Sequence, residues 1–157
     1  GFADTRGIEY DQQHIGNIVG CLKEVEYLNC IILVINGRAS RMTTMLKYVL
    51  TQVCSIMPRT ILQQVFIVFT NTADDLQLNF DISQLRHYFD ESIAQQYIVL
   101  ENPLASIEKA VKNACQIPKQ RLACALGSSL EQAFGALTDM FDRIVKFQPV
   151  HTNDFMK

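Results

Sequence analysis

A short polar segment follows a long apolar run and carries the residue types best suited to binding chemistry. It comprises Asn71, Thr72, Ala73 and Asp74, and it comes one residue after the run Val65–Phe69. A carboxylate held at the end of a strand can accept hydrogen bonds from the two neighbouring N–H groups of a guanine edge, while an asparagine holds the loop. The spacing therefore suits purine recognition, although a polar turn that caps the next segment has the same composition.

Four further positions could contribute to such a site. Arg38 and Arg41 flank a turn after another apolar run, and either guanidinium could reach a phosphate; solvated or carboxylate-paired arginines are the plainer alternative. Glu101 and Asn102 follow a third apolar run. A simple turn before Pro103 explains that pair equally well.

The residues by themselves predict neither a catalytic group nor a metal site. No serine or cysteine stands at a fixed spacing from any of the three histidines, so a catalytic triad is not indicated. The acidic pair Asp74 and Asp75 lacks the oxygen-rich loop that calcium binding requires. The five cysteines lie among apolar residues without a paired spacing, which favours small core residues in a reducing compartment: Cys21, Cys30, Cys54, Cys115 and Cys124.

Length and composition predict one folded domain. The chain has 157 residues, of which 48% are apolar and 19% charged, enough to form a layered core. Its net charge of −2 gives no reason to expect nucleic acid or anionic lipid as a partner. The run Cys30–Ile35 is far shorter than the roughly 20 residues of a transmembrane helix, so we expect a soluble, cytoplasmic protein.

The hydrophobic pattern alternates between helix and strand. Apolar residues at steps of three and four predict helices at 8–28, at 46–57 with Ser40 as its cap, at 82–89 after Asp81, at 104–117 and at 122–144. Unbroken apolar runs predict buried strands at 30–35, 65–69 and 97–100. The sequence thus predicts an α/β fold with a parallel or mostly parallel sheet, helices on both faces and helices at the C-terminal end. We expect residues 1–147 to form this unit and residues 148–157 to be a flexible tail.

In an open parallel sheet, ligands bind outside the carboxyl ends of the strands, where neighbouring crossovers diverge. This rule selects three segments, 36–41, 70–75 and 101–103. The polar residues described above all lie in them.

Several of these segments also resemble a known family. The opening Gly-Phe-Ala-Asp-Thr-Arg-Gly, the segment Ser40-Arg41-Met42-Thr43 and the triplet Phe69-Thr70-Asn71 are similar to the DTPGFGDTRG, SRLT and FTN strings of certain eukaryotic GTPases. These GTPases are related to the septins and to the avirulence-induced, immunity-associated GTPases. The resemblance covers roughly residues 1 to 102 and implies an incomplete P-loop NTPase-type G domain.

The resemblance assigns roles to the N-terminal residues. Gly1 corresponds to the last glycine of the DxxG switch motif, whose aspartate, a magnesium-binding residue, would lie before it. In a rival register, Asp4 and Gly7 themselves form this pair. In both registers Asp4, Thr5, Arg6 and Gly7 belong to the switch region, whose order depends on the bound nucleotide.

The resemblance also assigns the nucleotide-binding residues. Asn71 and Asp74 correspond to the base-reading NKxD motif, with Thr72 in the place of the lysine, and Asn102 lies in the last base-side loop. Threonine supplies neither the aliphatic stem nor the charge of that lysine. The intact parent is thereby expected to bind GTP or GDP with Mg²⁺, and relatives of this kind form homodimers across the nucleotide face.

The phosphate-binding GxxxxGK[ST] loop does not occur in the chain. Without its amides and lysine, little holds the β and γ phosphates, so we expect this chain alone to be inactive as a GTPase. Two hypotheses follow. The chain is either the larger part of a GTP-binding domain, or a nucleotide-free pseudo-GTPase that serves as a protein interaction module.

Overall fold

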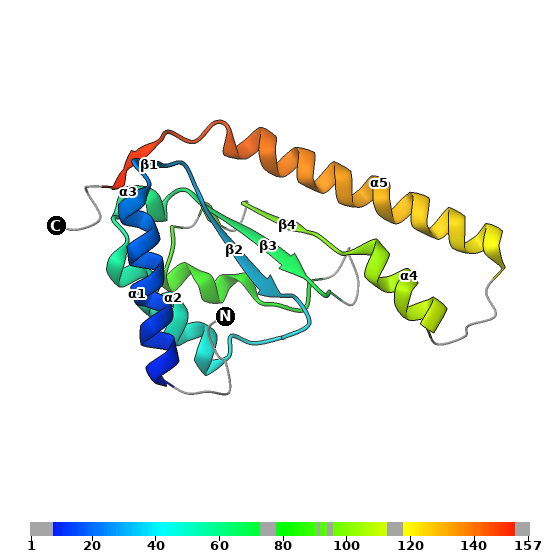
Figure 1. The fold of residues 1–157 in the computed structure, drawn as a ribbon, viewed down its shortest axis with the longest axis horizontal. Coiled ribbons are helices and arrows are strands. Elements are labelled where there is room, and N and C mark those ends of the chain that lie inside the picture. Colours follow the sequence, from blue (N-terminus) through cyan, green and yellow to red (C-terminus); the bar gives the residue numbers. More distant parts are fainter. Residues whose placement is uncertain (1–7, 73–77, 91, 94–95, 113–117, 153–157) are drawn as a thin grey trace.

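A computed structural model gives the fold of residues 8–72, 78–90, 92–93, 96–112 and 118–152 (Figure 1). Its central sheet has three parallel strands in the order β2-β3-β4: β2 (Ile31–Asn36), β3 (Val65–Thr70) and β4 (Tyr97–Val99). The helical segments described are α1 (Ile8–Glu24), α2 (Thr44–Ile56), α3 (Arg59–Leu62), the 3₁₀ helix η1 (Ile82–His87), α4 (Pro103–Lys112) and α5 (Lys119–Ile144). Two short strands, β1 (Tyr27–Leu28) and β5 (Val150–His151), pair antiparallel. The predicted α/β class and parallel sheet are confirmed.

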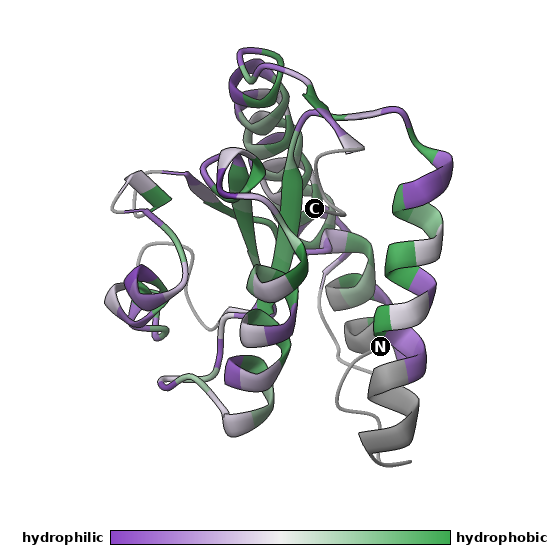
Figure 2. Ribbon diagram, turned by 90° about the vertical axis from the view of Figure 1, so that its left-hand side faces the viewer, coloured by the Kyte–Doolittle hydropathy of each residue, from purple (hydrophilic) through white to green (hydrophobic). Residues whose placement is uncertain are grey.

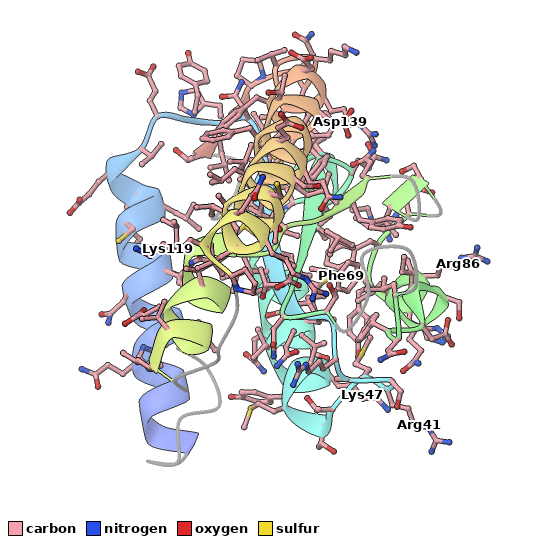
Figure 3. All side chains as sticks on the ribbon, turned by 90° about the vertical axis from the view of Figure 1, so that its right-hand side faces the viewer. Arg41, Lys47, Phe69, Arg86, Lys119 and Asp139 are labelled. Carbon is pink, nitrogen blue, oxygen red and sulfur yellow. The ribbon has the colours of Figure 1, made fainter. Side chains whose placement is uncertain are left out.

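The core lies on the two faces of β3, the middle strand, whose apolar residues are all buried. Because side chains alternate along a strand, Phe66 and Val68 meet Met140 of α5 on one face. On the other face Phe69 packs in a cluster with Leu50 of α2. Helices therefore cover both faces of the sheet, and the side views show the apolar strands between them (Figures 2 and 3).

The outer side of β2 is much less covered. The Ile31 amide donates to the Gln64 carbonyl at 3.0 Å and the Gly37 amide to the Thr70 carbonyl at 2.8 Å. In a parallel pair the intervening odd-numbered residues bond the same neighbour, so the amides of Ile32 and Val34 point to the other edge. No strand in the described part of the chain pairs with that edge.

The side chains of Ile32 and Val34 are also uncovered. They are 47% and 62% exposed, although they lie on the same face of the sheet as α5. The side views place α1 beside β2 on the flank away from β4, and α1 has only sparse contacts with the other elements (Figures 2 and 3). On the face of the sheet that packs against α5, the part formed by β2 is therefore uncovered.

Several element boundaries differ from the sequence predictions. The first helix ends at Glu24, and the following residues enter β1. Thr43, and not Ser40, caps α2, because its hydroxyl oxygen accepts a hydrogen bond from the Leu46 amide at 3.1 Å. The segment after Asp81 forms a 3₁₀ helix, with the Asp81 carboxylate accepting from the Ser83 amide.

The long helix α5 runs through both Gly127 and Gly135. Of the apolar stripe that the sequence predicts along this helix, Leu137 and Ile144 pack on the sheet beside the buried Met140, whereas Phe134 and Phe141 are 65% and 57% exposed. The apolar surface of α5 is thus wider than the face that the sheet covers, so periodicity identified the buried side only in part.

The first residues of the expected tail, 148–152, are held in place. Gln148 exchanges two hydrogen bonds with the Gln64 side chain, at 2.8 and 2.9 Å. Thr152 is buried; its amide donates to the Glu26 carbonyl at 3.0 Å and its hydroxyl to the Val25 carbonyl. These contacts connect positions far apart in sequence, which local patterns do not reveal. Residues 153–157 lie outside the described residues.

None of the described helices combines the length and the apolar composition needed to span a bilayer.

Leu50 tests the packing of α2 on the sheet. It is fully buried, so Leu50→Ala removes core contacts and leaves a cavity. We expect the free energy of unfolding to fall by about 2–5 kcal/mol in chemical denaturation. Thr51→Ala, at the neighbouring exposed position, is the control and should change it by no more than about 0.5 kcal/mol. Equal effects of the two substitutions would contradict this packing.

The cysteines differ in environment and should differ in reactivity. Cys30 and Cys54 are half-buried, whereas Cys21 and Cys124 are exposed. Burial raises the pKa of the Cys30 thiol from 9.0 to about 11, despite a smaller lowering by a backbone hydrogen bond to Phe66, and burial also raises the pKa of Cys54.

Because the thiolate is the reactive form, a raised pKa keeps Cys30 protonated and slow to react below pH 11. We expect iodoacetamide at pH 8 to modify Cys21 and Cys124 well before Cys30 and Cys54, as followed by peptide mass mapping. The rate at Cys30 should rise about tenfold per pH unit until its pKa is reached. Equal rates at all four positions in the folded protein would contradict the burial.

Candidate functional site

The loops after the three parallel strands meet at one edge of the sheet. Asn36 is in register with Thr70, and Phe69 with Val99, so the strands end nearly level. The loops enclose a crevice of about 420 Å³. Its lining comes from all three loops and from the start of α4: Arg38, Thr70, Asn71, Thr72, Leu100, Glu101, Asn102 and Ala105.

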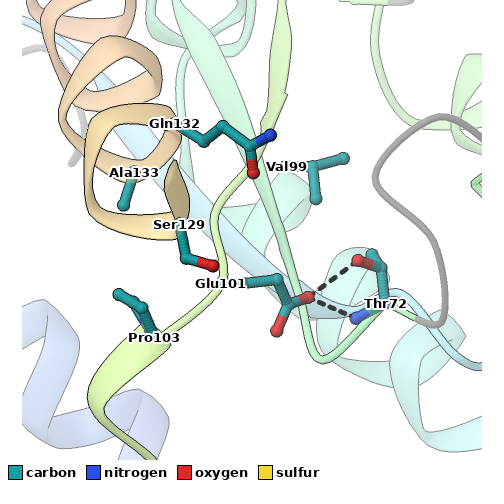
Figure 4. A pocket seen from close by; sticks show the side chains of 7 residues that line it. All are labelled: Thr72, Val99, Glu101, Pro103, Ser129, Gln132 and Ala133. Carbon is teal, nitrogen blue, oxygen red and sulfur yellow. Dashed lines mark hydrogen bonds between the residues drawn. The ribbon is translucent and has the colours of Figure 1, made fainter. Parts of the chain in front are cut away.

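Thr72 and Glu101 connect the second loop to the third. The Thr72 amide donates to Glu101 Oε1 at 2.5 Å, and the Thr72 hydroxyl donates to the same oxygen at 2.7 Å (Figure 4). Hydrogen bonds to a carboxylate are stronger than those between neutral groups. This pair therefore holds the two loops at a fixed separation.

Gly37 brings the first loop into the same contact. A Cβ atom at this position would overlap the Thr72 methyl group and would lie 3.4 Å from the Thr70 carbonyl oxygen. The close approach of the two loops therefore requires a residue without a side chain. One residue from each loop, Gly37, Thr72 and Glu101, thus forms a continuous line of contacts, which we call the loop clamp.

Asn71 turns the chain at the end of β3. Its φ angle of 54° lies in the left-handed region, which asparagine tolerates better than most residues. Its side-chain amide donates to Asn36 Oδ1 at 3.4 Å, and the same oxygen accepts from the Arg38 amide at 3.1 Å. Asn71 therefore shapes the crevice as well as lining it.

Asn102 has a structural role that the sequence did not specify. Its side-chain oxygen accepts from the amides of Leu104 at 3.1 Å and Ala105 at 3.3 Å. This is the pattern of an N-cap, and it begins α4. The Asn102 oxygen is thus engaged by the helix, while the residue still lines the crevice.

The structure brings together five of the residues that the sequence suggested: Arg38, Asn71, Thr72, Glu101 and Asn102. Arg41 is described but does not line this crevice. Gly1, Asp4, Thr5, Arg6, Gly7 and Asp74 lie outside the described residues. Glu101 has a larger role than we predicted, since its carboxylate anchors the clamp. A charged residue directly after an apolar strand was the only signal for it.

The expected Mg²⁺ has no set of ligands in this part of the chain. Among the described residues, no group of three or more histidine, cysteine, aspartate or glutamate side chains is arranged to hold a metal ion.

Gly37 gives a direct test of the clamp. We expect Gly37→Ala to lower the free energy of unfolding by about 1–3 kcal/mol, because the new methyl group displaces Thr72. Adding Thr72→Ser should restore most of this loss, since serine keeps the hydroxyl and lacks the overlapping methyl. Chemical denaturation of the single and double variants measures both effects.

Gly127→Ala is the matched control, because nothing lies within 4 Å of a Cβ atom at that helical position. It should stabilise the protein by up to about 1 kcal/mol. If Gly37→Ala proved as harmless as Gly127→Ala, the close contact between the first two loops would be refuted.

Comparisons with known proteins do not assign this site to a family. No family model matches the chain, and neither a curated protein nor a solved structure does.

Proposed function

We propose that this chain is the larger part of a guanine-nucleotide-binding domain and contributes the base-side half of the site. In this proposal the purine enters the crevice after β3 and β4, beside Asn71 and Asn102, and Asp74 accepts the N–H groups of the base. GTP or GDP is the ligand of the intact parent, with Mg²⁺ bound by residues of the phosphate side.

The observation that carries this proposal is the meeting of Asn71, Thr72 and Asn102 in one crevice. They come from two loops about 30 residues apart, and the crevice lies outside the carboxyl ends of parallel strands. Sites of this kind combine apolar walls with a few convergent polar groups, as Leu100 and the two asparagines do here.

The open side of the sheet gives further support. The free edge of β2 can pair with another strand, and the exposed Ile32 and Val34 can be covered by a helix beside α5. A strand followed by a helix satisfies both needs at once. A phosphate-binding loop joins such a strand to such a helix, and it would place its amides next to the first loop of the crevice.

Arg38 is the residue of this chain best placed to meet a charged group of the nucleotide. Its side chain is exposed and lines the crevice, whereas Thr72 directs its hydroxyl to Glu101. Arginine has the aliphatic stem and the charge that threonine lacks. We propose that Arg38 substitutes in part for the lysine of the base-reading motif.

The second candidate function is that of a protein interaction module. It is favoured by the apolar flank of α5, where Phe134, Phe141 and Val145 are more than half exposed. Exposed aromatic residues are typical of interaction surfaces. The same flank would be covered by the additional helix in the first proposal, so nucleotide binding distinguishes the two.

The test compares two proteins. Titration of this chain with a fluorescent GDP or GTP analogue should show no saturation below about 100 μM, because the chain has no phosphate-binding loop to hold the phosphates. A longer protein, extended upstream in the reading frame to include a GxxxxGK[ST] motif within roughly 60 to 70 residues of Gly1, should bind in the micromolar range or tighter.

In the longer protein, Asn71→Gly should weaken binding at least about tenfold, because glycine keeps the left-handed turn and removes the amide. The control, Asn17→Ala on the exposed surface of α1, should leave the affinity unchanged. Micromolar binding of the nucleotide by the shorter chain would contradict the proposal that a phosphate-binding loop is needed for affinity. An upstream region without the motif, together with no nucleotide binding, would favour the interaction module.

A further inference from the structure

A second pocket adjoins the crevice at Thr72 and Glu101 and extends toward α5. Its volume is about 450 Å³. Glu101, Ser129 and Gln132 supply the polar groups, and Val99, Pro103 and Ala133 supply apolar walls (Figure 4). Ser129, Gln132 and Ala133 belong to α5 and do not line the crevice, so this pocket does not require that a nucleotide be bound.

The Glu101 carboxylate has one engaged oxygen and one open oxygen. Both hydrogen bonds from Thr72 reach Oε1, and the other oxygen, Oε2, is turned away from Thr72 in Figure 4. Within the described part of the chain, Oε2 has neither a hydrogen-bond partner nor an ion-pair partner. A half-buried carboxylate that is held rigidly on one side favours a cationic or N–H-donating ligand on the other.

The α5 wall adds acceptors to that carboxylate. Ser129 offers a hydroxyl oxygen and Gln132 an amide oxygen, and among the residues that the structure describes, the lining contains no lysine, arginine or histidine. A ligand with several N–H donors in one plane can satisfy acceptors on both walls, whereas an ammonium group is a compact, strongly hydrated charge. The flat faces of such a ligand would pack on Val99 and Pro103.

We propose that this pocket is a binding site for a small guanidinium compound, with Glu101 Oε2 accepting its N–H groups. Thr72 positions the carboxylate, and Ser129 and Gln132 complete the set of acceptors. The proposal is independent of the nucleotide proposal, because its ligand has no phosphate and two of its polar groups lie on α5.

The test is an NMR titration of the ¹⁵N-labelled chain with ethylguanidinium chloride, at ionic strength matched with sodium chloride. We expect saturable shifts at the amides of Thr72, Glu101, Ser129 and Gln132, with a Kd of about 1–10 mM. Ethylammonium chloride should bind at least about threefold more weakly.

Glu101→Gln is the decisive variant, because its amide oxygen can still accept from Thr72 while the negative charge is lost. We expect the Kd to rise at least about tenfold. Glu108→Gln, an exposed carboxylate on α4 that pairs with Lys112, is the matched control and should leave the Kd unchanged. If Glu101→Gln fails to fold, Gln132→Ala on the exposed side of α5 should still raise the Kd about threefold or more.

The proposal is overturned if the shifts do not saturate, if they map away from this pocket, if sodium chloride alone produces them, or if the Glu101 and Gln132 variants bind as the wild type does. Guanidinium binding without nucleotide binding would leave this site in place and remove only the proposed function. Nucleotide binding without guanidinium binding would do the reverse.

Discussion

The geometry of the crevice depends on the contact between Thr72 and Glu101. Two hydrogen bonds to one carboxylate oxygen join the loops after β3 and β4, and the Thr72 methyl group packs against Gly37 from the loop after β2. The three loops can approach this closely only because Gly37 has no side chain. Because Gly37, Thr72 and Glu101 come from three different loops, a shift of any one loop changes the shape of the whole crevice.

The same contact connects the two pockets. Glu101 lines both the crevice with Asn71 and Asn102 and the pocket that extends to α5. One carboxylate thus contributes to both sites. The Thr72 hydrogen bonds to Oε1 fix the position of this shared carboxylate with respect to both pockets.

The strands of the sheet are unequally buried, and the exposed strand β2 could contact a partner. The apolar residues of β3 are buried on both faces, whereas Ile32 and Val34 of β2 remain exposed on the α5 face of the sheet, beside an edge with which no described strand pairs. Apolar surface and unpaired backbone groups at one place favour a partner that supplies both a strand and a covering face. The crevice lies at the carboxyl end of β2, so a strand paired along the free edge would also extend the candidate site.

The sequence by itself determined the helix and strand types, the parallel sheet and the edge at which Asn71, Thr72 and Asn102 meet, because uninterrupted apolar runs, helical spacing and βαβ connections are local or nearly local properties. It missed the cap at Thr43, although that contact is local, because Ser40 offers the same capping hydroxyl. It did not reveal which part of the apolar surface of α5 is buried or that β5 pairs with β1, since both depend on contacts between distant residues. Only the tertiary structure decided the role of Glu101. A glutamate after a strand has no pattern of its own, and its hydrogen bonds to Thr72 exist because the fold places two loop ends, 29 positions apart in the chain, side by side.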